Sequence, residues 1–346
     1  MDIKRIIVSR TDKIGDLILS IPSFFMIKKM YPNAELVVLV RKYNYEIVKN
    51  LPYIDRIMKI DEYSQSDLIE KIAYFKADVF IALYNDSFVA KLARASKAKI
   101  RIGPISKLSS IFTYNKGVWQ KRSKSIKNEG KYNLDLVRKL DKELYQKVYE
   151  LNTKLYYEEK HRNAAELFFK MNDIKGQALV INPFIGGSAK NIKDEEYSNL
   201  IMNFKRRNPD ISVIVTCHIS EEERGEKLLK NSLEKGIYLY ANGGELLNIA
   251  AIIDRADVYL GASTGPTHIA GALKKRIVAI YPAKKTQSII RWGVLGDDKV
   301  FYLIPDQNNP LENYNNPHFD KYDKNMELEL ILALERALKL EEGGKN

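Results

Sequence analysis

Two carboxylates stand just after the first apolar run of the chain. Asp12 and Asp16 follow the segment RIIVS at residues 5–9, and Gly15 permits a tight turn between them. A carboxylate at the end of a strand can act as a general base, with Asp16 the candidate and Asp12 the alternative. Asp16 also suits the first turn of a helix, where free backbone N–H groups stabilise negative charge. The spacing alone leaves both interpretations open.

A glycine-rich segment with a lysine follows a later apolar run. It reads INPFIGGSAK at residues 181–190 and contains Ser188 and Lys190. Backbone N–H groups in such a turn can approach a phosphate, and a lysine adds positive charge. The G-x-x-x-x-G-K spacing of a P-loop is missing, so an ordinary loop is the alternative.

A third polar segment leads into a helix. After YLGA come Ser263 and the run Thr264, Gly265, Pro266, Thr267 and His268. Proline suits the first turn of a helix, and the N–H groups there bind anions. His268 can donate to a phosphate or simply pack. The four histidines show no metal-ligand spacing, and no G-x-G-x-x-G follows the first strand, so we expect no metal and no dinucleotide.

Positive charge gathers in the first half of the chain. The net charge is +12, and residues 1–170 hold 33 Lys and Arg against 20 Asp and Glu. Residues 91–131 carry 12 basic residues and one acid. This segment is either a solvated face or a docking surface for an anionic partner. The candidates for such a surface are Lys91, Arg94, Lys97, Lys99, Arg101, Lys107, Lys121, Arg122 and Lys124.

Short apolar runs alternate with amphipathic stretches, a pattern typical of parallel α/β sheets covered on both faces. We expect strands at residues 5–9, 34–40, 56–60, 77–84, 99–102, 178–182, 211–217, 236–240, 256–260, 276–281 and 300–303. Helices are expected at residues 16–30, 43–50, 65–74, 87–95, 194–206, 221–234, 244–254, 266–273 and 326–340.

The pattern occurs twice and predicts two Rossmann-like domains, at residues 1–171 and 178–325, with a cleft between them. Residues 326–346 follow as a separate helix. One cysteine, Cys217, allows no intramolecular disulfide. The longest apolar stretch, residues 17–27, is too short to span a bilayer, so we expect a protein that is soluble or attached to a surface from outside.

Three segments in this order resemble glycosyltransferase family 9, the heptosyltransferase family of lipopolysaccharide core assembly. They are IIVSRTDKIGDLILSIPSFFMIKKMYPNAELVVLV, INPFIGGSAKNIKDEEY and ADVYLGASTGPTHIAGALKKRIVAIYP. RIGP at residues 101–104 and NEGKYNLDL at residues 128–136 also resemble the family. The resemblance covers most of residues 1–282.

The resemblance implies a GT-B fold, with the final helix crossing back to the N-terminal domain. It implies an inverting, metal-independent transfer in which the N-terminal domain binds the acceptor and the C-terminal domain binds the nucleotide sugar. Asp16 matches the family's base. Lys190, Thr264, Gly265 and His268 match groups that bind the donor diphosphate. The donor set that we expect is Ser188, Lys190, Glu222, Ser263, Thr264, Gly265, Pro266, Thr267 and His268.

The function that the resemblance implies is transfer of heptose from ADP-heptose to an anionic lipid A–Kdo type of core. The expected location is cytoplasmic, peripheral on the inner membrane, with no nucleic-acid partner. Ser263, Ile192, Phe184 and the AKKTQ loop depart from the family pattern. Two alternatives therefore stay open: another nucleotide sugar, for a capsule or glycoprotein glycan, or a non-catalytic protein that binds anionic surfaces. The loop at residues 306–325 is a possible lid.

Overall fold

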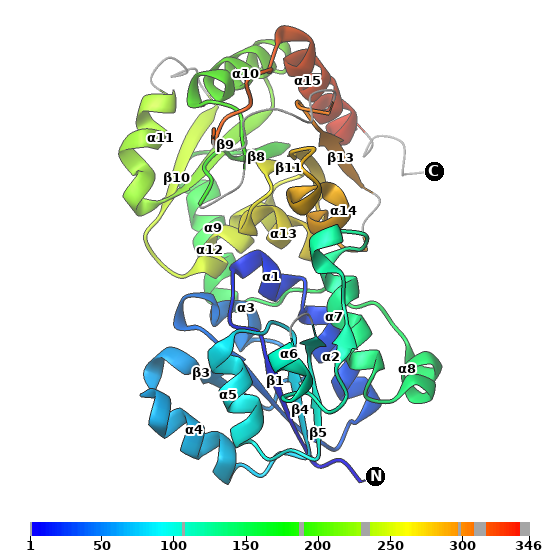
Figure 1. The fold of residues 1–346 in the computed structure, drawn as a ribbon. Coiled ribbons are helices and arrows are strands. Elements are labelled where there is room, and N and C mark those ends of the chain that lie inside the picture. Colours follow the sequence, from blue (N-terminus) through cyan, green and yellow to red (C-terminus); the bar gives the residue numbers. More distant parts are fainter. Residues whose placement is uncertain are drawn as a thin grey trace. The chain divides into compact units, whose positions relative to one another are not determined.

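The computed structural model describes residues 2–105, 108–186, 190–229, 236–296, 299–307 and 316–339 (Figure 1). The chain divides into two compact units, Met1–Tyr156 and Tyr157–Asn346. Each unit is built around one large parallel sheet. None of the helices in the described ranges combines the length and the apolar character that crossing a bilayer requires.

The first unit has a five-stranded parallel sheet in the order β3-β2-β1-β4-β5. Its strands are β1 (Arg5–Ser9), β2 (Glu35–Val40), β3 (Arg56–Lys59), β4 (Val79–Ala82) and β5 (Ile100–Ile102); β6 (Pro104–Ile105) and β7 (Val118–Trp119) form a separate pair. The order reverses between β1 and β4, which leaves room for a site where these two strands end. The core of β1 is a run of buried residues, as expected for a strand with both faces covered.

Two groups of helices cover the two faces of this sheet (Figure 1). The helices are α1 (Ile14–Ile18), α2 (Ile21–Met30), α3 (Glu46–Lys49), α4 (Gln65–Tyr74), α5 (Ser87–Ala95), α6 (Leu108–Ile111), α7 (Glu129–Arg138) and α8 (Lys142–Val148), with 3-10 turns η1 (Lys42–Asn44), η2 (Ile60–Glu62) and η3 (Arg122–Lys124). Helices α4 and α5 pack with alternate residues of β1, β2 and β4. Helices α7 and α8 both pack on α2.

The sequence predicts one helix over residues 16–30, but the structure has two. Helix α1 ends at Ile18 and α2 begins at Ile21. Pro22 lacks the N–H that would continue the ladder, and it occupies the first turn of α2. The Ser20 hydroxyl donates to the Asp16 carbonyl oxygen at 2.8 Å, which satisfies one end of α1. The break keeps α1 short and holds Asp16 beside the end of β1.

The second unit has a six-stranded parallel sheet in the order β10-β9-β8-β11-β12-β13. The strands are β8 (Ala178–Asn182), β9 (Ser212–His218), β10 (Ile237–Asn242), β11 (Val258–Ala262), β12 (Arg276–Ile280) and β13 (Val300–Leu303). The order reverses between β8 and β11. The glycine-rich segment follows β8 and the Thr264 segment follows β11, so both leave the sheet at its switch point.

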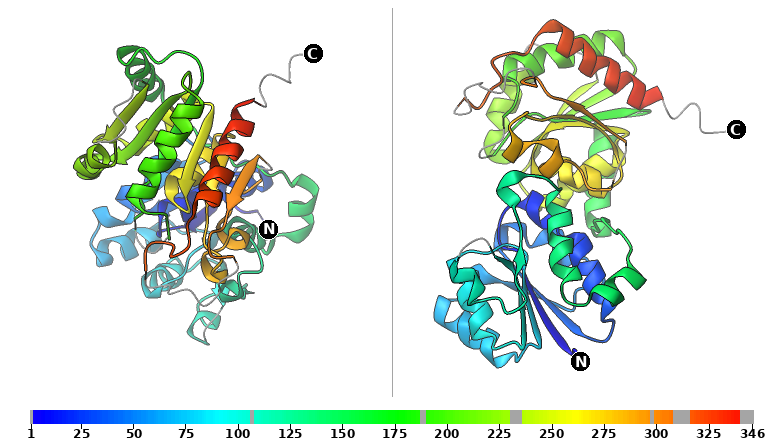
Figure 2. Two further views of the ribbon diagram at one scale, coloured as in Figure 1. Left: turned by 90° about the horizontal axis from the view of Figure 1, so that it is seen from above. Right: turned by 45° about the vertical axis from the view of Figure 1, so that its right-hand side comes forward.

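Helices cover both faces of the second sheet as well (Figure 2). They are α9 (Glu159–Met171), α10 (Asp194–Arg207), α11 (Glu222–Leu229), α12 (Leu246–Arg255), α13 (Gly265–Ala272), α14 (Ile289–Trp292) and α15 (Lys324–Lys339), with 3-10 turns η4 (Ile219–Glu221) and η5 (Lys285–Gln287). Helices α10, α11 and α15 bury their apolar residues in one core with alternate strand positions. Helix α12 packs with α9 and α13.

The boundary between the units lies earlier than the sequence predicts. The first domain was expected to include residues 157–171, but helix α9 belongs to the second unit. The reason is packing: α9 lies along α12, the ring of Phe168 meets that of Tyr240, and Arg255 lies over Phe169.

The last helix also differs from the expectation. Residues 326–346 were expected to cross back to the N-terminal domain, but α15 packs against β11, β12, β13 and α10 of its own unit. Leu330, Leu334 and Leu338 repeat at helical spacing and are buried in that core. Residues 340–346 lie outside the described part of the chain, as do residues 308–315 of the loop considered as a lid.

Candidate functional site

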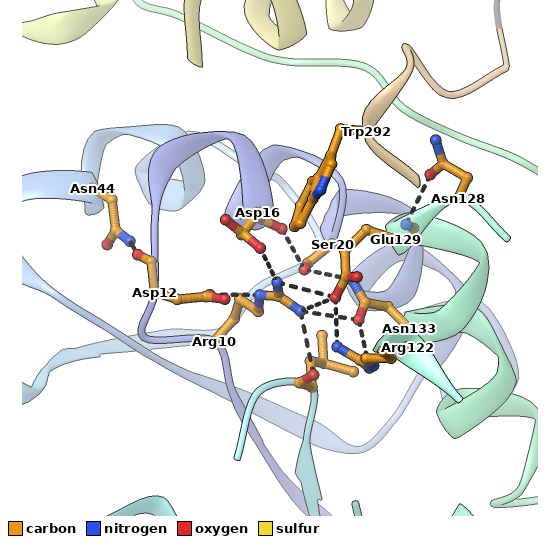
Figure 3. A network of polar contacts seen from close by, with 12 residues as sticks. Arg10, Asp12, Asp16, Ser20, Asn44, Arg122, Asn128, Glu129, Asn133 and Trp292 are labelled. Atoms are coloured by element: carbon orange, nitrogen blue, oxygen red, sulfur yellow. Dashed lines mark hydrogen bonds and ion pairs between the residues drawn. The ribbon is translucent and has the colours of Figure 1, made fainter. Parts of the chain in front are cut away.

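A buried arginine occupies the switch point of the first sheet. Arg10 follows β1 directly, and its backbone N–H donates to the Leu39 carbonyl oxygen at 3.0 Å. Its side chain is 1% exposed, and Nη1 donates to the carbonyl oxygen of Leu83, just after β4, at 3.2 Å (Figure 3). A guanidinium at this depth requires anionic partners.

Three carboxylates supply them. Nε of Arg10 lies 2.6 Å from Oδ1 of Asp12, and Nη2 lies 2.5 Å from Oδ1 of Asp16. Nη1 lies 3.4 Å from Oε1 of Glu129 (Figure 3). The structure therefore brings both carboxylates that the sequence singles out onto one guanidinium group. Arg10 and Glu129 are not among the site residues that the sequence predicts.

Helix α7 contributes Glu129 and Asn133 to this cluster. Asn133 Oδ1 accepts from Arg10 at 3.0 Å, and its Nδ2 donates to the hydroxyl of Ser20 at 3.0 Å. Asn128 caps α7 by accepting from the Gly130 N–H at 2.9 Å, which fixes where Glu129 lies. In the sequence, the segment NEGKYNLDL at residues 128–136 is notable only because it resembles the family. Nothing in the sequence indicates that Glu129 contacts Arg10.

Arg122 corrects one assignment. It was expected on a basic surface facing acceptor or membrane, but its side chain is half-buried and Nη1 lies 2.5 Å from Oε1 of Glu129. Its Nε donates to Gln120 at 2.8 Å, and its guanidinium lies 5.7 Å from the centre of the Tyr132 ring. Arg122 is thus the second cation of the buried cluster.

The pKa values of Arg10 and Asp12 are shifted by burial and by the charges around them. Burial by itself lowers the pKa of Arg10, but the carboxylates of Asp12, Asp16 and Glu129 together raise it above its ordinary value. Burial raises the pKa of Asp12 to about 7, against the effect of Arg10 and with that of Asp16. A perturbed carboxyl beside a second carboxylate at the end of a strand is typical of a proton-transfer site.

Asp16 lies at the edge of this cluster. It belongs to α1, and its side chain is 12% exposed, while Arg10 behind it is 1% exposed. Arg10 holds one oxygen of the carboxylate, and Ser20 holds the main chain of the same residue. The arrangement presents a fixed, partly accessible carboxylate that can accept a proton.

In the second unit, Lys190 follows the glycine-rich turn. The side chain is 2% exposed, and Nζ lies 5.5 Å from the centre of the Phe319 ring. The neighbouring Asn191 forms a bridge with His318 and donates to the Pro183 carbonyl oxygen at 2.6 Å, which fixes the end of the loop. Ser188 lies outside the described residues.

The Thr264 segment begins helix α13, as expected. Thr264 is the N-cap residue, Gly265 and Pro266 form the first turn, and His268 is buried. Thr267 is fully buried, and its hydroxyl donates to the Ala262 carbonyl oxygen at 2.5 Å, so this side chain stabilises the loop itself. Lys190 and the start of α13 follow the carboxyl ends of the paired strands β8 and β11, and the N-terminus of a helix favours negative charge.

Two other expected donor residues are Ser263, directly before the N-cap of α13, and Glu222. Ser263 is half-buried, and the nearby Tyr281 is buried and donates to the Trp292 carbonyl oxygen at 2.9 Å. Glu222 is exposed at the first residue of α11, which follows β9. Its neighbour Arg224 pairs with Asp194 at 2.6 Å.

Some residues of the expected basic surface are exposed, whereas others form hydrogen bonds within the protein. Arg94 donates to the Thr113 hydroxyl, and Arg101 donates to the carbonyl oxygens of Thr113 and Ala98, each at 2.8 Å. Lys91, Lys97, Lys99, Lys121 and Lys124 are exposed, and Lys107 lies outside the described residues. Large apolar side chains accompany them: Phe112 is 84% exposed, Trp119 65% and Ile126 60%.

A group with metal-ligand character lies elsewhere in the second unit. Glu158, His161 and Glu245 bring ligand atoms within 4.8 Å of one another. His161 Nδ1 accepts from the Glu158 N–H at 3.1 Å, and Nε2 lies 2.9 Å from Oε2 of Glu245. Lys160 also pairs with Glu245. These contacts cap α9 and join it to the start of α12, which accounts for the group as a structural one.

The known proteins that this chain resembles are glycosyltransferases. The model of glycosyltransferase family 9 (heptosyltransferase) matches residues 66–317. A Haemophilus influenzae protein named "Putative glycosyltransferase" is 30% identical over 313 residues, which cover 87% of this chain and 89% of the relative. Lipopolysaccharide heptosyltransferase 3 of Escherichia coli is 21% identical over 282 residues, which cover 78% of this chain and 80% of the relative.

A solved structure supports the fold. The structure of E. coli ADP-heptose LPS heptosyltransferase II matches with a TM-score of 0.78 at 16% identity, and the match covers 98% of this chain and 100% of that chain. Together with the two Rossmann-like sheets, this likeness confirms the GT-B fold that the sequence predicted.

Proposed function

This chain belongs to glycosyltransferase family 9, and from that premise we propose that it transfers heptose from ADP-heptose to an anionic lipopolysaccharide or lipooligosaccharide core. The chain is a glycosyltransferase of the heptosyltransferase type. The observation that carries the proposal is the Asp16 carboxylate, held by buried Arg10 at the carboxyl end of the first sheet.

The proposed reaction inverts the anomeric carbon. Asp16 takes the proton of an acceptor hydroxyl, and that oxygen forms a bond to the anomeric carbon of the donor from the opposite face. The bond from this carbon to the diphosphate oxygen breaks, and its electron pair leaves with ADP. A positioned base contributes about 10²–10⁴-fold to such a step.

The leaving diphosphate needs positive charge around it. In the proposal this comes from Lys190, His268 and the N–H groups at the start of α13, with Glu222 and Ser263 as contacts to the rest of the donor. Preorganised groups of this kind are typically worth about 3–4 kcal/mol each to the transition state. Transfer should then proceed with no metal ion.

The acceptor side of the proposal uses the first unit. An anionic core matches its excess of basic residues, and such an acceptor belongs to a membrane. The exposed lysines at residues 91–124 and the exposed Phe112, Trp119 and Ile126 favour attachment to an anionic bilayer surface, on the cytoplasmic face of the inner membrane.

The test begins with nucleotide binding. We expect calorimetric titration of ADP, UDP, GDP and CMP, with EDTA present, to give selective ADP binding. Transfer is then followed with ADP-heptose and a heptose-deficient core acceptor. Wild-type protein should transfer heptose, and Asp16→Asn should lose at least about 10²-fold in kcat while it still binds ADP. Full turnover by Asp16→Asn would contradict its role as the base.

A second donor remains a specific alternative. Ser263 stands where the family has an acidic residue, and Ile192 stands where it has a tryptophan and is buried in the core. These changes favour a different sugar or nucleotide on the same fold. Selective binding of UDP, GDP or CMP in the same titration would support this alternative and contradict ADP-heptose.

A further inference from the structure

A buried lysine and a buried aromatic ring meet in the second unit, although they are far apart in the sequence. Nζ of Lys190 lies 5.5 Å from the centre of the Phe319 ring, and the two residues are 2% and 1% exposed. An ammonium group at this depth has lost most of its hydration, which is costly. The face of an aromatic ring compensates in part, because its π electrons attract a cation within about 6 Å.

The main chain fixes the ring beside the lysine. Asn191, directly after Lys190, donates its N–H to the Pro317 carbonyl oxygen at 3.0 Å. Its carbonyl oxygen accepts from the Phe319 N–H at 3.1 Å. The two bonds form a parallel bridge between Asn191 and His318. A shift of Phe319 relative to Lys190 would break both of them.

The side chain of Asn191 extends this attachment. Its Nδ2 donates to the Pro183 carbonyl oxygen at 2.6 Å, and its Oδ1 accepts from the Tyr197 hydroxyl at 2.9 Å. Pro183 directly follows β8, and Tyr197 is a fully buried residue of α10. Asn191 thus joins the end of β8, helix α10 and residues 317–319. The segment that carries Phe319 is therefore part of the support of Lys190.

Burial alone does not require an aromatic side chain at position 319. Phe319 belongs to the apolar core of the second unit, together with Ile192 and Leu334, where a leucine would also be buried. A phenyl ring differs from leucine because its face attracts an ammonium group. It differs from a carboxylate because it brings no negative charge that would oppose a bound diphosphate. The contact therefore suits a lysine that binds an anion.

We propose that Phe319 is a positioning residue that holds Lys190 ready for the donor diphosphate. This role rests on the proposed function, in which Lys190 binds that diphosphate. Phe319 acts through the lysine and does not itself touch the donor. A flexible side chain loses rotamer freedom when it binds an anion, and a side chain that is already held loses less. Immobilising one such side chain corresponds to about 2- to 12-fold in Kd, which is the effect that we expect from loss of the ring.

The first experiment observes Lys190 in the ligand-free protein, so its result depends on neither donor nor acceptor. NMR with 13C-labelled lysine gives the chemical shift and the order parameter of the Lys190 ε-methylene group, which is assigned by its loss in Lys190→Ala. In wild-type protein we expect a ring-current shift and a high order parameter. Phe319→Leu should remove the ring-current shift and lower the order parameter.

Phe204→Leu is the matched control. Phe204 is a fully buried phenylalanine of α10 in the same core, so each variant loses one ring of the same size. The Lys190 signal should keep its shift and its order in Phe204→Leu. An order parameter that is unchanged in Phe319→Leu, or that falls equally in both variants, would overturn the positioning role.

The second experiment measures ADP binding by calorimetric titration in EDTA. Phe319→Leu should raise the Kd for ADP by about 2- to 12-fold, and Phe204→Leu should leave it unchanged. A double variant tests whether Phe319 acts through Lys190. In the Lys190→Ala background, Phe319→Leu should add no further loss. A full additional loss in that background would show that Phe319 affects binding by another route, and the proposal would be wrong.

Fluorinated phenylalanine at position 319 covers the case in which Phe319→Leu does not fold. Successive fluorine atoms weaken the attraction of the ring for a cation and change its size little. The Lys190 order parameter should fall and the Kd for ADP should rise as fluorine atoms are added; a flat series would overturn the role of the ring face. If the wild-type protein binds no ADP, the proposed function fails, and the ligand-free NMR result decides by itself whether Phe319 holds Lys190.

Discussion

Lys190 and Asp12 are ionisable side chains that are buried, and burying an ionised group is costly. Lys190 is 2% exposed beside Phe319, and the pKa of Asp12 is raised by its burial. Such residues are poor choices for stability alone. Both lie where a strand next to a switch point ends, one in each unit. Single substitutions can therefore test both residues: Lys190 through ligand binding, and Asp12 through the dependence of stability on pH.

Lys190→Ala should weaken ADP binding. A hydrogen bond to a charged group contributes about 1.5–3 kcal/mol, which corresponds to about 10- to 150-fold in Kd. Calorimetric titration in EDTA measures the change, and Lys193→Ala, an exposed lysine nearby, serves as the control. A Kd for ADP that does not change, in a variant with a normal melting curve, would rule out Lys190 as a donor-binding residue.

Asp12 should make stability depend on pH. Burial raises the pKa of Asp12 from its ordinary value of 3.8 to about 7. Between these values the folded protein keeps a proton that the unfolded chain has released, so this contribution to stability is complete below about pH 4 and disappears as the pH rises through about 7. Asp12→Asn should flatten that part of the curve in denaturant titrations, and Asp61→Asn should not.

At the scale of elements, polar side chains of α7 bind Arg10, the residue that follows strand β1 of the first sheet. Helix α7 packs on α2, but Glu129 and Asn133 also join it to the end of β1 through Arg10. Arg122 ties the preceding 3-10 turn η3 to the same cluster. The position of Asp16 therefore depends on a helix that lies more than 100 residues away in the sequence.

Glu129→Ala should destabilise the protein strongly. It leaves the buried guanidinium of Arg10 and the half-buried one of Arg122 with one fewer carboxylate, and breaking a buried pair in this way costs about 3–5 kcal/mol. Chemical denaturation measures the loss in the free energy of unfolding. Glu70→Ala, at an exposed position of α4, should cost little by comparison. A loss below about 1 kcal/mol would mean that Arg10 does not depend on Glu129.

At the scale of the whole molecule, charge is divided unequally. Residues 1–170 carry 33 basic and 20 acidic residues, whereas residues 171–346 carry 23 basic and 24 acidic. The exposed Phe112 and Trp119 belong to the basic half. Lysines with exposed aromatic rings suit the boundary between lipid headgroups and acyl chains.

The paired variant Phe112→Ser, Trp119→Ser should bind anionic vesicles more weakly. Binding of the wild-type protein should fall as salt rises, because each basic residue near the surface contributes about 1 kcal/mol through screened attraction. Sedimentation with vesicles of phosphatidylglycerol, and of phosphatidylcholine alone, measures both effects. Tyr74→Ser, another exposed aromatic on α4, is the control. Equal binding by the pair and the control would exclude this surface as the anchor.

The amino-acid sequence determined most of the elements. Continuous apolar runs predicted the strands at residues 5–9, 178–182 and 300–303 with the bounds that the structure has. For β1 and β8 the reason is that a parallel strand buried on both faces has little freedom of composition. The helix start at Thr264 was predicted as well, since proline and free N–H groups act locally. Asp16 and Lys190 were identified from strand ends and from the resemblance to glycosyltransferase family 9.

Only the tertiary structure decided which charges meet. Arg10 and Glu129 are 119 positions apart, and no local pattern pairs them. Its sequence neighbours predict a surface position for Arg122, whereas the structure pairs it with Glu129. Helices α9 and α15 were assigned to the wrong neighbours, because an amphipathic face predicts burial but does not say against which surface. Local propensity acts within a few residues, whereas ion pairing and packing depend on which parts of the chain the fold brings together.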